Sequence, residues 1–159
     1  MKYYAKCNRV NNQDEIHLQD SDGETLYIIK KESLKKSKAI DIMNADYLPA
    51  FHVHISPLKI KGRYQVFNNL NALKINISLG FHLLHRVEIG DKRLVCKANL
   101  FKIKYWLYDG DAVIGRLAVV KKQDERYFEI KLERNDDIIN VIALYVIAQA
   151  QRMNFLKKG

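Results

Sequence analysis

The feature that most constrains this fold is a long apolar run near the end of the chain, without glycine or proline. At 100° per residue its large side chains cover nearly the whole circumference of a helix, and a helix that is apolar all round is buried on all sides. These side chains are Ile138, Ile139, Val141, Ile142, Leu144, Tyr145, Val146 and Ile147. We therefore predict a central helix over about residues 136–152.

The residues that flank this run also suit a helix. Acidic or amide side chains can cap its start, and basic side chains near its other end match the helix dipole. They are Asn135, Asp136 and Asp137 at the start and Arg152, Lys157 and Lys158 at the end. The many Ile and Val residues leave a strand as the alternative, but the length, the cap and the following Ala148–Gln151 favour a helix.

Turn-forming residues recur through the rest of the chain at regular distances. They are Asp20–Gly23, Asn44–Asp46, Asn68–Asn71, Gly90–Asp91, Asp109–Asp111 and Arg134–Asp137. Such residues tolerate positive φ or bond their own backbone, so they mark tight reversals. The segments between them are β-branched, aromatic or alternating, as in Thr25–Ile29, Phe51–Ile55 and Tyr127–Leu132. We predict about twelve strands over residues 2–133.

Second corners lie between these turns, and four of them carry a leucine. The leucines are Leu34, Leu58, Leu79 and Leu100, separated by steps of 24, 21 and 21 residues, and a fifth corner near Gln123–Glu125 has none. A unit of this length holds two strands and two turns, so each unit returns the chain to its starting direction. Equivalent corners are therefore expected to gather at one end of the folded domain.

The predicted strands and helix match in size. A helix is about 10–12 Å across with its side chains. A barrel of about eight strands is filled by its own side chains, whereas one of about eleven can hold a central helix. We therefore expect a mainly β fold, a closed or nearly closed barrel of about twelve antiparallel strands around a buried hydrophobic C-terminal helix. Residues 1–159 are expected to form a single domain.

Composition bears on location and partners. Cys7 and Cys96 are the only cysteines and their spacing indicates no disulfide, so two buried thiols in a reducing cytoplasm are expected. The N-terminus lacks the apolar stretch of a signal peptide, and the longest apolar stretch, Ile138–Ala148, is too short to cross a membrane. The formal charge of +9 favours an acidic partner, although such a charge also serves solubility.

A family resemblance rests on the layout and on the last part of the chain. The row of strand pairs with corners such as Leu58–Val66 resembles the tubby C-terminal-like superfamily, as does Tyr127–Ile130 followed by Asp136, Asp137 and an apolar helix. The member type that it resembles is the LURP-one-related proteins of plants and their small bacterial relatives, with phospholipid scramblases and tubby as more distant kin. The resemblance covers nearly the whole chain and implies a twelve-stranded barrel around a central C-terminal helix.

What the resemblance implies about function is a role at lipids. Tubby domains bind phosphoinositides at membranes, and scramblases move lipids. This sequence has no scramblase-like cysteine cluster, no added transmembrane helix and no convincing calcium loop. Tubby's lipid-binding residues match no specific positions here, so none is carried over.

Lysines at the corners form the candidate site for phosphate or another anionic ligand. Lys59 and Lys61 are expected on one face of a strand, as are Lys102 and Lys104. A ring of such charges would attract phosphates through its summed field, while solvated turns that protect strand edges are the alternative. The candidate residues are Lys35, Lys36, Lys38, Lys59, Lys61, Arg63, Lys102, Lys104, Lys121 and Lys122.

Two other sets of residues suggest ligands less specifically. The strand-region histidines His52, His54, His82 and His85 could together ligate zinc, but their spacing matches no known zinc site, so neither a metal nor a cofactor is expected. Asp20–Glu24 has the carboxylates of a calcium loop, but its glycine comes too early for the EF-hand pattern, and a hairpin turn is expected.

Aromatic residues lie beside two of the lysines. Tyr105, Trp106 and Tyr108 next to Lys102 and Lys104 would suit base stacking with phosphate contact, although aromatics in strands more often belong to the core or to cross-strand pairs.

No GxSxG elbow, P-loop or HExxH motif is present, so a non-catalytic binding module is expected rather than an enzyme. The favoured function is docking to anionic phospholipid headgroups or a membrane surface through the basic corner loops, from the cytoplasm and without a transmembrane segment. The alternatives are a protein-interaction or regulatory scaffold and, third, nucleic-acid binding.

Overall fold

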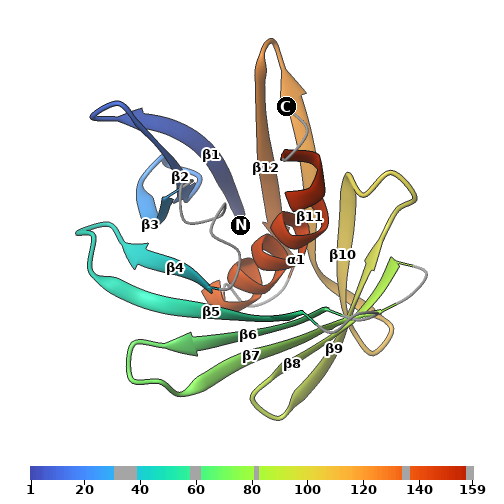
Figure 1. The fold of residues 1–159 in the computed structure, drawn as a ribbon. Helices are drawn as coiled ribbons and strands as arrows, with labels where there is room; N and C mark the ends of the chain where they lie inside the picture. Colours follow the sequence, from blue (N-terminus) through green and yellow to red (C-terminus); the bar gives the residue numbers. More distant parts are fainter. Residues whose placement is uncertain (31–38, 58–61, 81–82, 134–136, 157–159) are drawn as a thin grey trace.

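A computed structural model describes residues 1–30, 39–57, 62–80, 83–133 and 137–156 (Figure 1). Within these residues the chain forms twelve strands followed by one long helix. The strands are β1 (Lys2–Val10), β2 (Gln13–Gln19), β3 (Thr25–Lys30), β4 (Ala39–Asn44), β5 (Pro49–Pro57), β6 (Gly62–Asn68), β7 (Leu73–Leu79), β8 (Leu84–Ile89), β9 (Lys92–Ala98), β10 (Lys104–Asp109), β11 (Ala112–Lys122) and β12 (Glu125–Leu132), and the helix is α1 (Ile138–Leu156).

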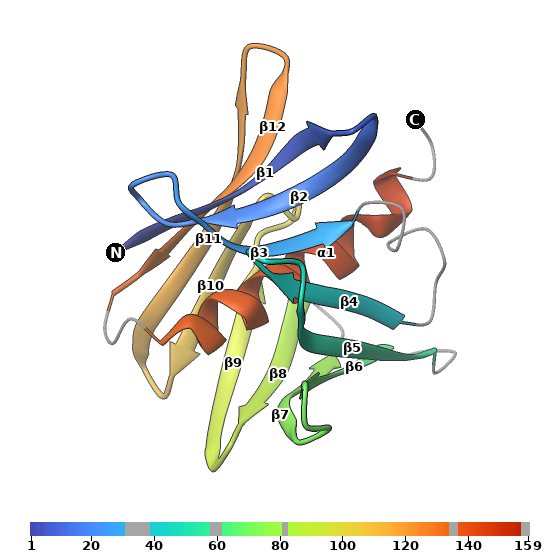
Figure 2. The ribbon, with the colours of Figure 1, turned by 90° about the vertical axis from the view of Figure 1, so that its left-hand side faces the viewer.

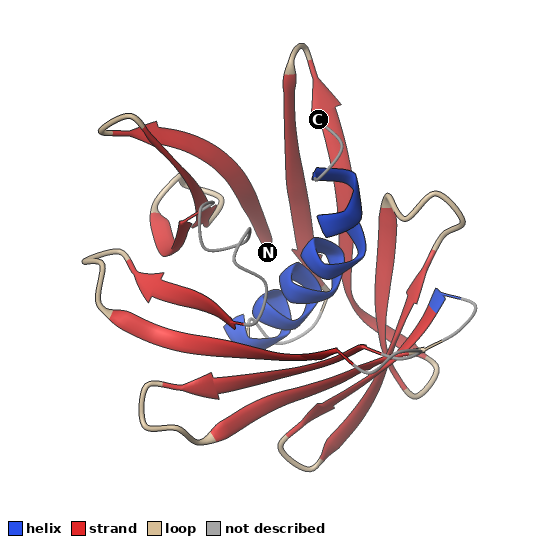
Figure 3. Ribbon diagram, viewed as in Figure 1, coloured by secondary structure: helices blue, strands red, loops and turns tan. Residues whose placement is uncertain are grey.

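The strands form one closed barrel. Each pairs antiparallel with the next along the chain, and β1 pairs with β12 to complete the ring (Figure 3). At that closing seam Tyr3 lies opposite Ile130. Between β3 and β4 the described residues contribute two register pairs, Tyr27 with Asn44 and Ile28 with Met43. The predicted barrel of antiparallel strands is therefore confirmed.

The helix α1 runs through the middle of the barrel (Figures 1 and 2). Every residue from Val141 to Gln149 is buried, as predicted for a helix that is apolar on all sides. The helix begins slightly later than predicted because Asp137 is its cap: the Asp137 Oδ1 accepts a hydrogen bond from the Ile139 N–H at 3.2 Å. It ends at Leu156 instead of near residue 152.

The repeat predicted from the spacing of turns appears as one hydrogen-bonding pattern used three times. Asp20, Asn44 and Asn68 stand 24 residues apart, and each closes a hairpin. In each, the side-chain Oδ1 accepts hydrogen bonds from the backbone N–H groups two and four residues further on, at 2.9–3.0 Å. Asp20–Glu24 is therefore a hairpin turn, as predicted.

The antiparallel order sends successive loops to two opposite ends of the barrel. Loops that leave odd-numbered strands reach one end, which we call the corner end, and loops that leave the even-numbered strands reach the other, which we call the turn end. The helix follows β12, so it begins at the turn end and runs toward the corner end (Figure 2). The described corners therefore gather at one end of the barrel, as predicted.

One local prediction is wrong. Cys7 is exposed, whereas Cys96 is buried as expected, and burial raises the Cys96 pKa to about 12. The corner leucines differ in burial: Leu79 ends β7 and packs against the core, but Leu100 is 79% exposed. Leu34 and Leu58 lie outside the described residues.

Candidate functional site

The corner end collects basic residues from several separate hairpins. Arg63 opens β6, Lys102 lies between β9 and β10, and Lys104 begins β10. Lys121 and Lys122 end β11. The other candidates predicted from sequence, namely Lys35, Lys36, Lys38, Lys59 and Lys61, lie outside the described residues. Because antiparallel hairpins return to the same end, residues up to 59 positions apart in sequence belong to one surface.

Most of these charges are available to an outside partner. Arg63, Lys104, Lys121 and Lys122 are exposed, and none forms an ion pair with any residue that the structure describes. Lys102 is half-buried and has contacts of its own. The four exposed side chains therefore carry positive charge that is not held in an ion pair, although Asp124 and Glu125 lie in the same hairpin as Lys121 and Lys122.

Lys102 and Lys104 do not share a strand face, which corrects the prediction. Lys102 lies in the turn with a φ of +55°, and β10 begins only at Lys104. The turn is built around Asn99, whose Oδ1 accepts hydrogen bonds from the Ile103 and Lys104 N–H groups at 2.9 and 3.1 Å. This turn is one residue longer than the pattern at Asp20.

The turns at the turn end have the opposite charge. Its hairpin turns cover residues 20–24, 45–48, 69–72, 90–91 and 110–111, all of which the structure describes. Every charged residue within these turns is acidic: Asp20, Asp22, Glu24, Asp46, Asp91 and Asp111. The turns at this end are thus acidic, while the exposed basic residues Lys74, Lys92 and Arg93 lie on the strands next to them.

The corner end also exposes apolar side chains that sequence reasoning missed. Leu100 is 79% exposed, Phe101 75% and Ile103 38%, all in the loop between β9 and β10. On the neighbouring strand β8, Leu84 is 43% exposed. Two adjacent large apolar residues directly after the turn residue Asn99 are the signal of this surface in the sequence, but Leu100 also fits the spacing of the corner leucines, which masks that signal.

The three aromatic residues near this loop differ in burial. Tyr105 is fully buried in the barrel core, and its hydroxyl donates to the Lys102 carbonyl oxygen at 3.1 Å. Trp106 and Tyr108 are half-buried, and the Lys97 Nζ lies 4.9 Å from the centre of the Tyr108 ring. Tyr105 therefore belongs to the core, so the base-stacking arrangement considered from sequence loses one of its three rings.

The three candidate histidines that the structure describes lie in different surroundings and do not form a metal site with one another. His52 and His54 are exposed on β5, where Val53 between them faces the core, and the His52 Nδ1 lies 2.7 Å from the Asp41 Oδ1. His85 instead points into the barrel and is 1% exposed. Burial, and then the charge of Lys102, lower the His85 pKa to about 4. His82 lies outside the described residues.

A cavity of about 930 Å³ opens at the turn end around the start of α1. The aromatic rings of Tyr27 and Phe51, with centres 5.6 Å apart, line part of it, and Asn140 of the helix lines another part. Lys74 and Lys92 contribute basic groups, while Asp91 and Asp137 contribute acidic ones. The lining is therefore mixed in polarity and close to balanced in charge, unlike the corner end.

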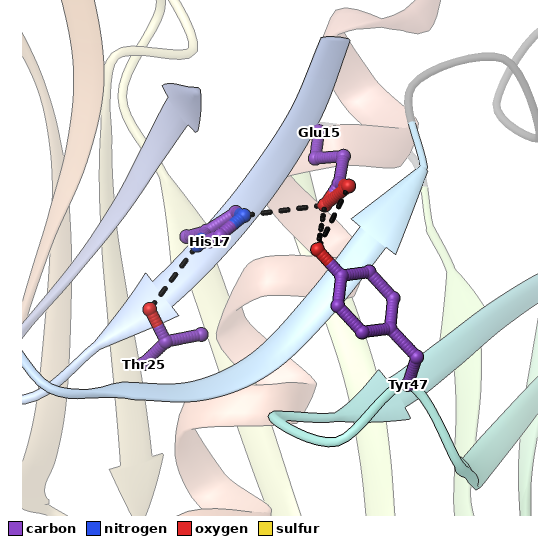
Figure 4. Close-up of polar contacts among 4 residues, drawn as sticks. All are labelled: Glu15, His17, Thr25 and Tyr47. Carbon is purple, nitrogen blue, oxygen red and sulfur yellow. Dashed lines mark hydrogen bonds and ion pairs between the residues drawn. The ribbon is translucent and has the colours of Figure 1, made fainter. Parts of the chain in front are cut away.

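Four polar side chains form a hydrogen-bonded cluster around the buried Glu15 of β2 (Figure 4). Glu15 is 4% exposed, and its carboxylate accepts hydrogen bonds from the Tyr47 hydroxyl at 3.0 and 3.1 Å. The His17 ring lies 3.3 Å from Glu15 on one side and 3.1 Å from the Thr25 hydroxyl on the other. These four residues do not line the cavity at the turn end, and they link β2 to the β4–β5 turn across β3.

Comparison with known proteins identifies a related fold. No protein-family model matches the chain, and no curated protein matches it. An X-ray structure of a protein from Arabidopsis thaliana superposes with a TM-score of 0.64, covering 95% of this chain and 91% of the plant protein. The two chains share a fold. Their sequences are 15% identical, so the likeness concerns the barrel and not the residues of any site.

Proposed function

We propose that this protein is a non-catalytic module that docks on anionic phospholipid membranes through the corner end of its barrel. The observation that carries the proposal is the arrangement of charge on the barrel, with unpaired basic side chains at one end and acidic turns at the other. No helix in the part of the chain that the structure describes is long and apolar enough to cross a membrane, so the proposed contact is peripheral.

The expected strength of this contact follows from simple electrostatics. Each basic residue near an anionic membrane surface contributes about 1 kcal/mol, and the effect falls off within a Debye length of about 8–10 Å. Arg63, Lys104, Lys121 and Lys122 together would therefore give a measurable but reversible affinity that falls with added salt. The acidic turns lie at the far end of the barrel, away from the proposed contact.

Membership of the tubby C-terminal-like superfamily, of the LURP-one-related type, is part of the same proposal. A closed barrel of twelve antiparallel strands around a C-terminal helix supports it, as does the plant protein of similar fold. Nucleic acid would also respond to the basic end, but the burial of Tyr105 weakens the stacking surface that single strands need.

Flotation with vesicles tests the proposal. We expect the protein to float at low salt with vesicles of phosphatidylcholine and phosphatidylserine, and to stay unbound with phosphatidylcholine alone. The K104E/K121E/K122E variant should lose binding. The matched control, K74E/K92E/R93E, changes the net charge equally, but on exposed residues near the turn end, and should bind nearly as well as the native protein.

Two results would contradict the proposal. Equal recovery with neutral and anionic vesicles at low salt would show that the basic end does not select anionic lipid. Equal loss of binding in both triple variants would mean that overall charge, and not its position on the barrel, governs the interaction. A salt-sensitive gel shift with nucleic acid in the absence of any vesicle binding would instead favour the nucleic-acid alternative.

A further inference from the structure

We infer that the loop between β9 and β10 inserts the Leu100 and Phe101 side chains into the acyl-chain boundary of an anionic bilayer. This inference rests on the proposed function and adds an apolar anchor to its electrostatic contact. It assigns the loop a partner of defined chemistry, namely a membrane surface that offers negative headgroups above an apolar layer.

The exposure of these two side chains is the first observation. Leu100 and Phe101 are 79% and 75% exposed, and among the large apolar side chains that the structure describes only Leu70, at the opposite end of the barrel, is exposed to a similar extent. Ile103 in the same loop and Leu84 beside it extend the apolar surface. Contiguous exposed apolar surface on a folded domain marks a site of interaction with a protein or a membrane.

The hydrogen bonding of the loop backbone is the second observation. The Asn99 N–H donates to the Lys104 carbonyl oxygen at 3.0 Å, and the Lys102 N–H donates to the Asn99 carbonyl oxygen at 3.0 Å. The Ile103 carbonyl oxygen accepts from the Val119 N–H of β11 at 2.8 Å. These bonds satisfy backbone groups on both sides of the Leu100–Phe101 tip, and groups that are already bonded within the protein cost little to move away from water.

This bonding also fixes the loop before it meets a membrane. The Tyr105 hydroxyl, held in the barrel core, bonds the Lys102 carbonyl oxygen at 3.1 Å, and the Asn99 side chain bonds the two N–H groups that end the turn. The apolar side chains are therefore presented on a rigid tip, and little conformational freedom is lost on insertion.

The position of the loop selects a membrane over an acidic protein surface. Lys104 follows it directly and is exposed, and Lys121 and Lys122 project at the same end. Lysine side chains beside an inserted apolar tip can reach up to the headgroups while their stems stay in the boundary region. Charge and apolar surface thus lie at one end of the barrel, which suits a partner that has both.

The opposite end of the barrel offers a matched control. Leu70 in the turn between β6 and β7 is 81% exposed, and Leu48 in the turn between β4 and β5 is 58% exposed. Both lie among acidic turns, so neither should enter an anionic bilayer. Substitution at either end removes comparable exposed apolar surface, and all four side chains are exposed enough to be replaced without loss of the fold.

Binding to vesicles of phosphatidylcholine and phosphatidylserine provides the first test. Removing both apolar tips in L100S/F101S should weaken partitioning by about ten- to a hundredfold, because burial of two large apolar side chains is lost. The control L48S/L70S should partition like the native protein. Circular dichroism and the melting temperature establish that both variants are folded.

The depth of the loop provides the second test. Trp106 is the only tryptophan of the chain, so the F101W/W106F variant places a single fluorophore on the tip of the loop. On anionic vesicles this tryptophan should be quenched by lipids brominated on their acyl chains, whereas the tryptophan of the L70W/W106F control should not be quenched.

The outcomes separate this inference from the function on which it rests. If the native protein binds anionic vesicles but L100S/F101S binds equally well and F101W/W106F is not quenched, insertion is wrong and electrostatic docking stands. If the native protein binds no anionic vesicle, both fail. Weakened binding of L100S/F101S together with acyl-chain quenching supports insertion.

Discussion

Gly115 of β11 lies directly against Leu144 of the central helix: a Cβ added to Gly115 would come within 3.1 Å of the Leu144 Cδ1. The same added atom would lie 3.2 Å from the Leu132 Cδ2 on the neighbouring strand. A glycine at this position therefore lets the helix approach the barrel wall closely, and the helix has more contacts with β11 than with any other strand.

Substitution of Gly115 should destabilise the packing of the helix against β11, and more so for a larger side chain. We expect G115V to lower the free energy of unfolding by about 1–3 kcal/mol, as overpacking of a filled core does, and G115A to have a smaller effect. Denaturant melts of the three proteins measure the series. If space were open at this position, G115A would instead be stabilising, because alanine suits a strand interior better than glycine.

Removal of the helix should abolish folding altogether. Its eight large apolar residues, if fully buried, contribute roughly 12–24 kcal/mol at ~1.5–3 kcal/mol each, as an upper estimate, whereas the whole stability of a domain is typically ~5–15 kcal/mol. A fragment of residues 1–135 should therefore lack a cooperative thermal transition. A soluble 1–135 fragment with native-like circular dichroism and a sharp melt would show that the barrel stands without its central helix.

Much of the fold could be read from the sequence because its signals are local and repeated. Turn residues such as Asp20, Asn44 and Asn68 act through hydrogen bonds within five residues, so their spacing revealed the strand pairs. The central helix could be predicted because its apolar residues cover every face, and such a helix must be buried by the rest of the protein on all sides. The size match between helix and barrel then followed from their dimensions.

The candidate site was harder to read because exposure depends on how each loop ends. Leu79 and Leu100 are both corner leucines 21 residues apart, but Leu79 ends a strand and packs against the core, whereas Leu100 lies in a turn and is exposed. Cys7 continues the inward-facing row of Tyr3 and Ala5 along β1, yet it lies nearer the corner end, where it is exposed. Alternation predicts a side chain's face but not where the core stops.

The buried His85 should make the domain sensitive to acid. Its folded-state pKa of about 4 lies below the value of about 6.5 expected in the unfolded chain, so the unfolded state binds a proton first. The native protein should therefore lose stability as pH falls from 6.5 to 4, by about 3 kcal/mol from this group, with no further loss from it below pH 4. At neutral pH and above the group is neutral in both states and contributes no pH dependence.

Comparison with a variant isolates that contribution. H85N keeps an acceptor near the Gly80 N–H, which donates to the His85 Nδ1 at 3.3 Å, but it cannot take up a proton. Melts of both proteins between pH 7 and 4 should show the smaller loss of stability in H85N. Parallel losses in the two proteins would mean that His85 is protonated in the folded state without cost.

The Tyr47 hydroxyl should be the element that holds the β4–β5 turn against β2. It donates to the buried Glu15 carboxylate from 32 positions away in the sequence, and it crosses the seam between β3 and β4 where the described pairing is short. Its hydrogen bond to Glu15 is also the main reason why the Tyr47 pKa is raised. Y47F removes the bond and leaves a buried carboxylate with one donor fewer, so it should lower the melting temperature.

A double-mutant cycle distinguishes this bond from simple loss of the tyrosine. E15Q keeps the shape of the acceptor but removes its charge, so the effect of Y47F should be smaller in the E15Q background than in the native one. Amide hydrogen exchange tests the effect strand by strand. The amides of β3 and β4 should exchange faster in Y47F, while the exchange rates of β11 and β12 should be unchanged. Additive effects of the two substitutions, with uniform exchange around the barrel, would mean that the Tyr47–Glu15 pair does not hold this seam.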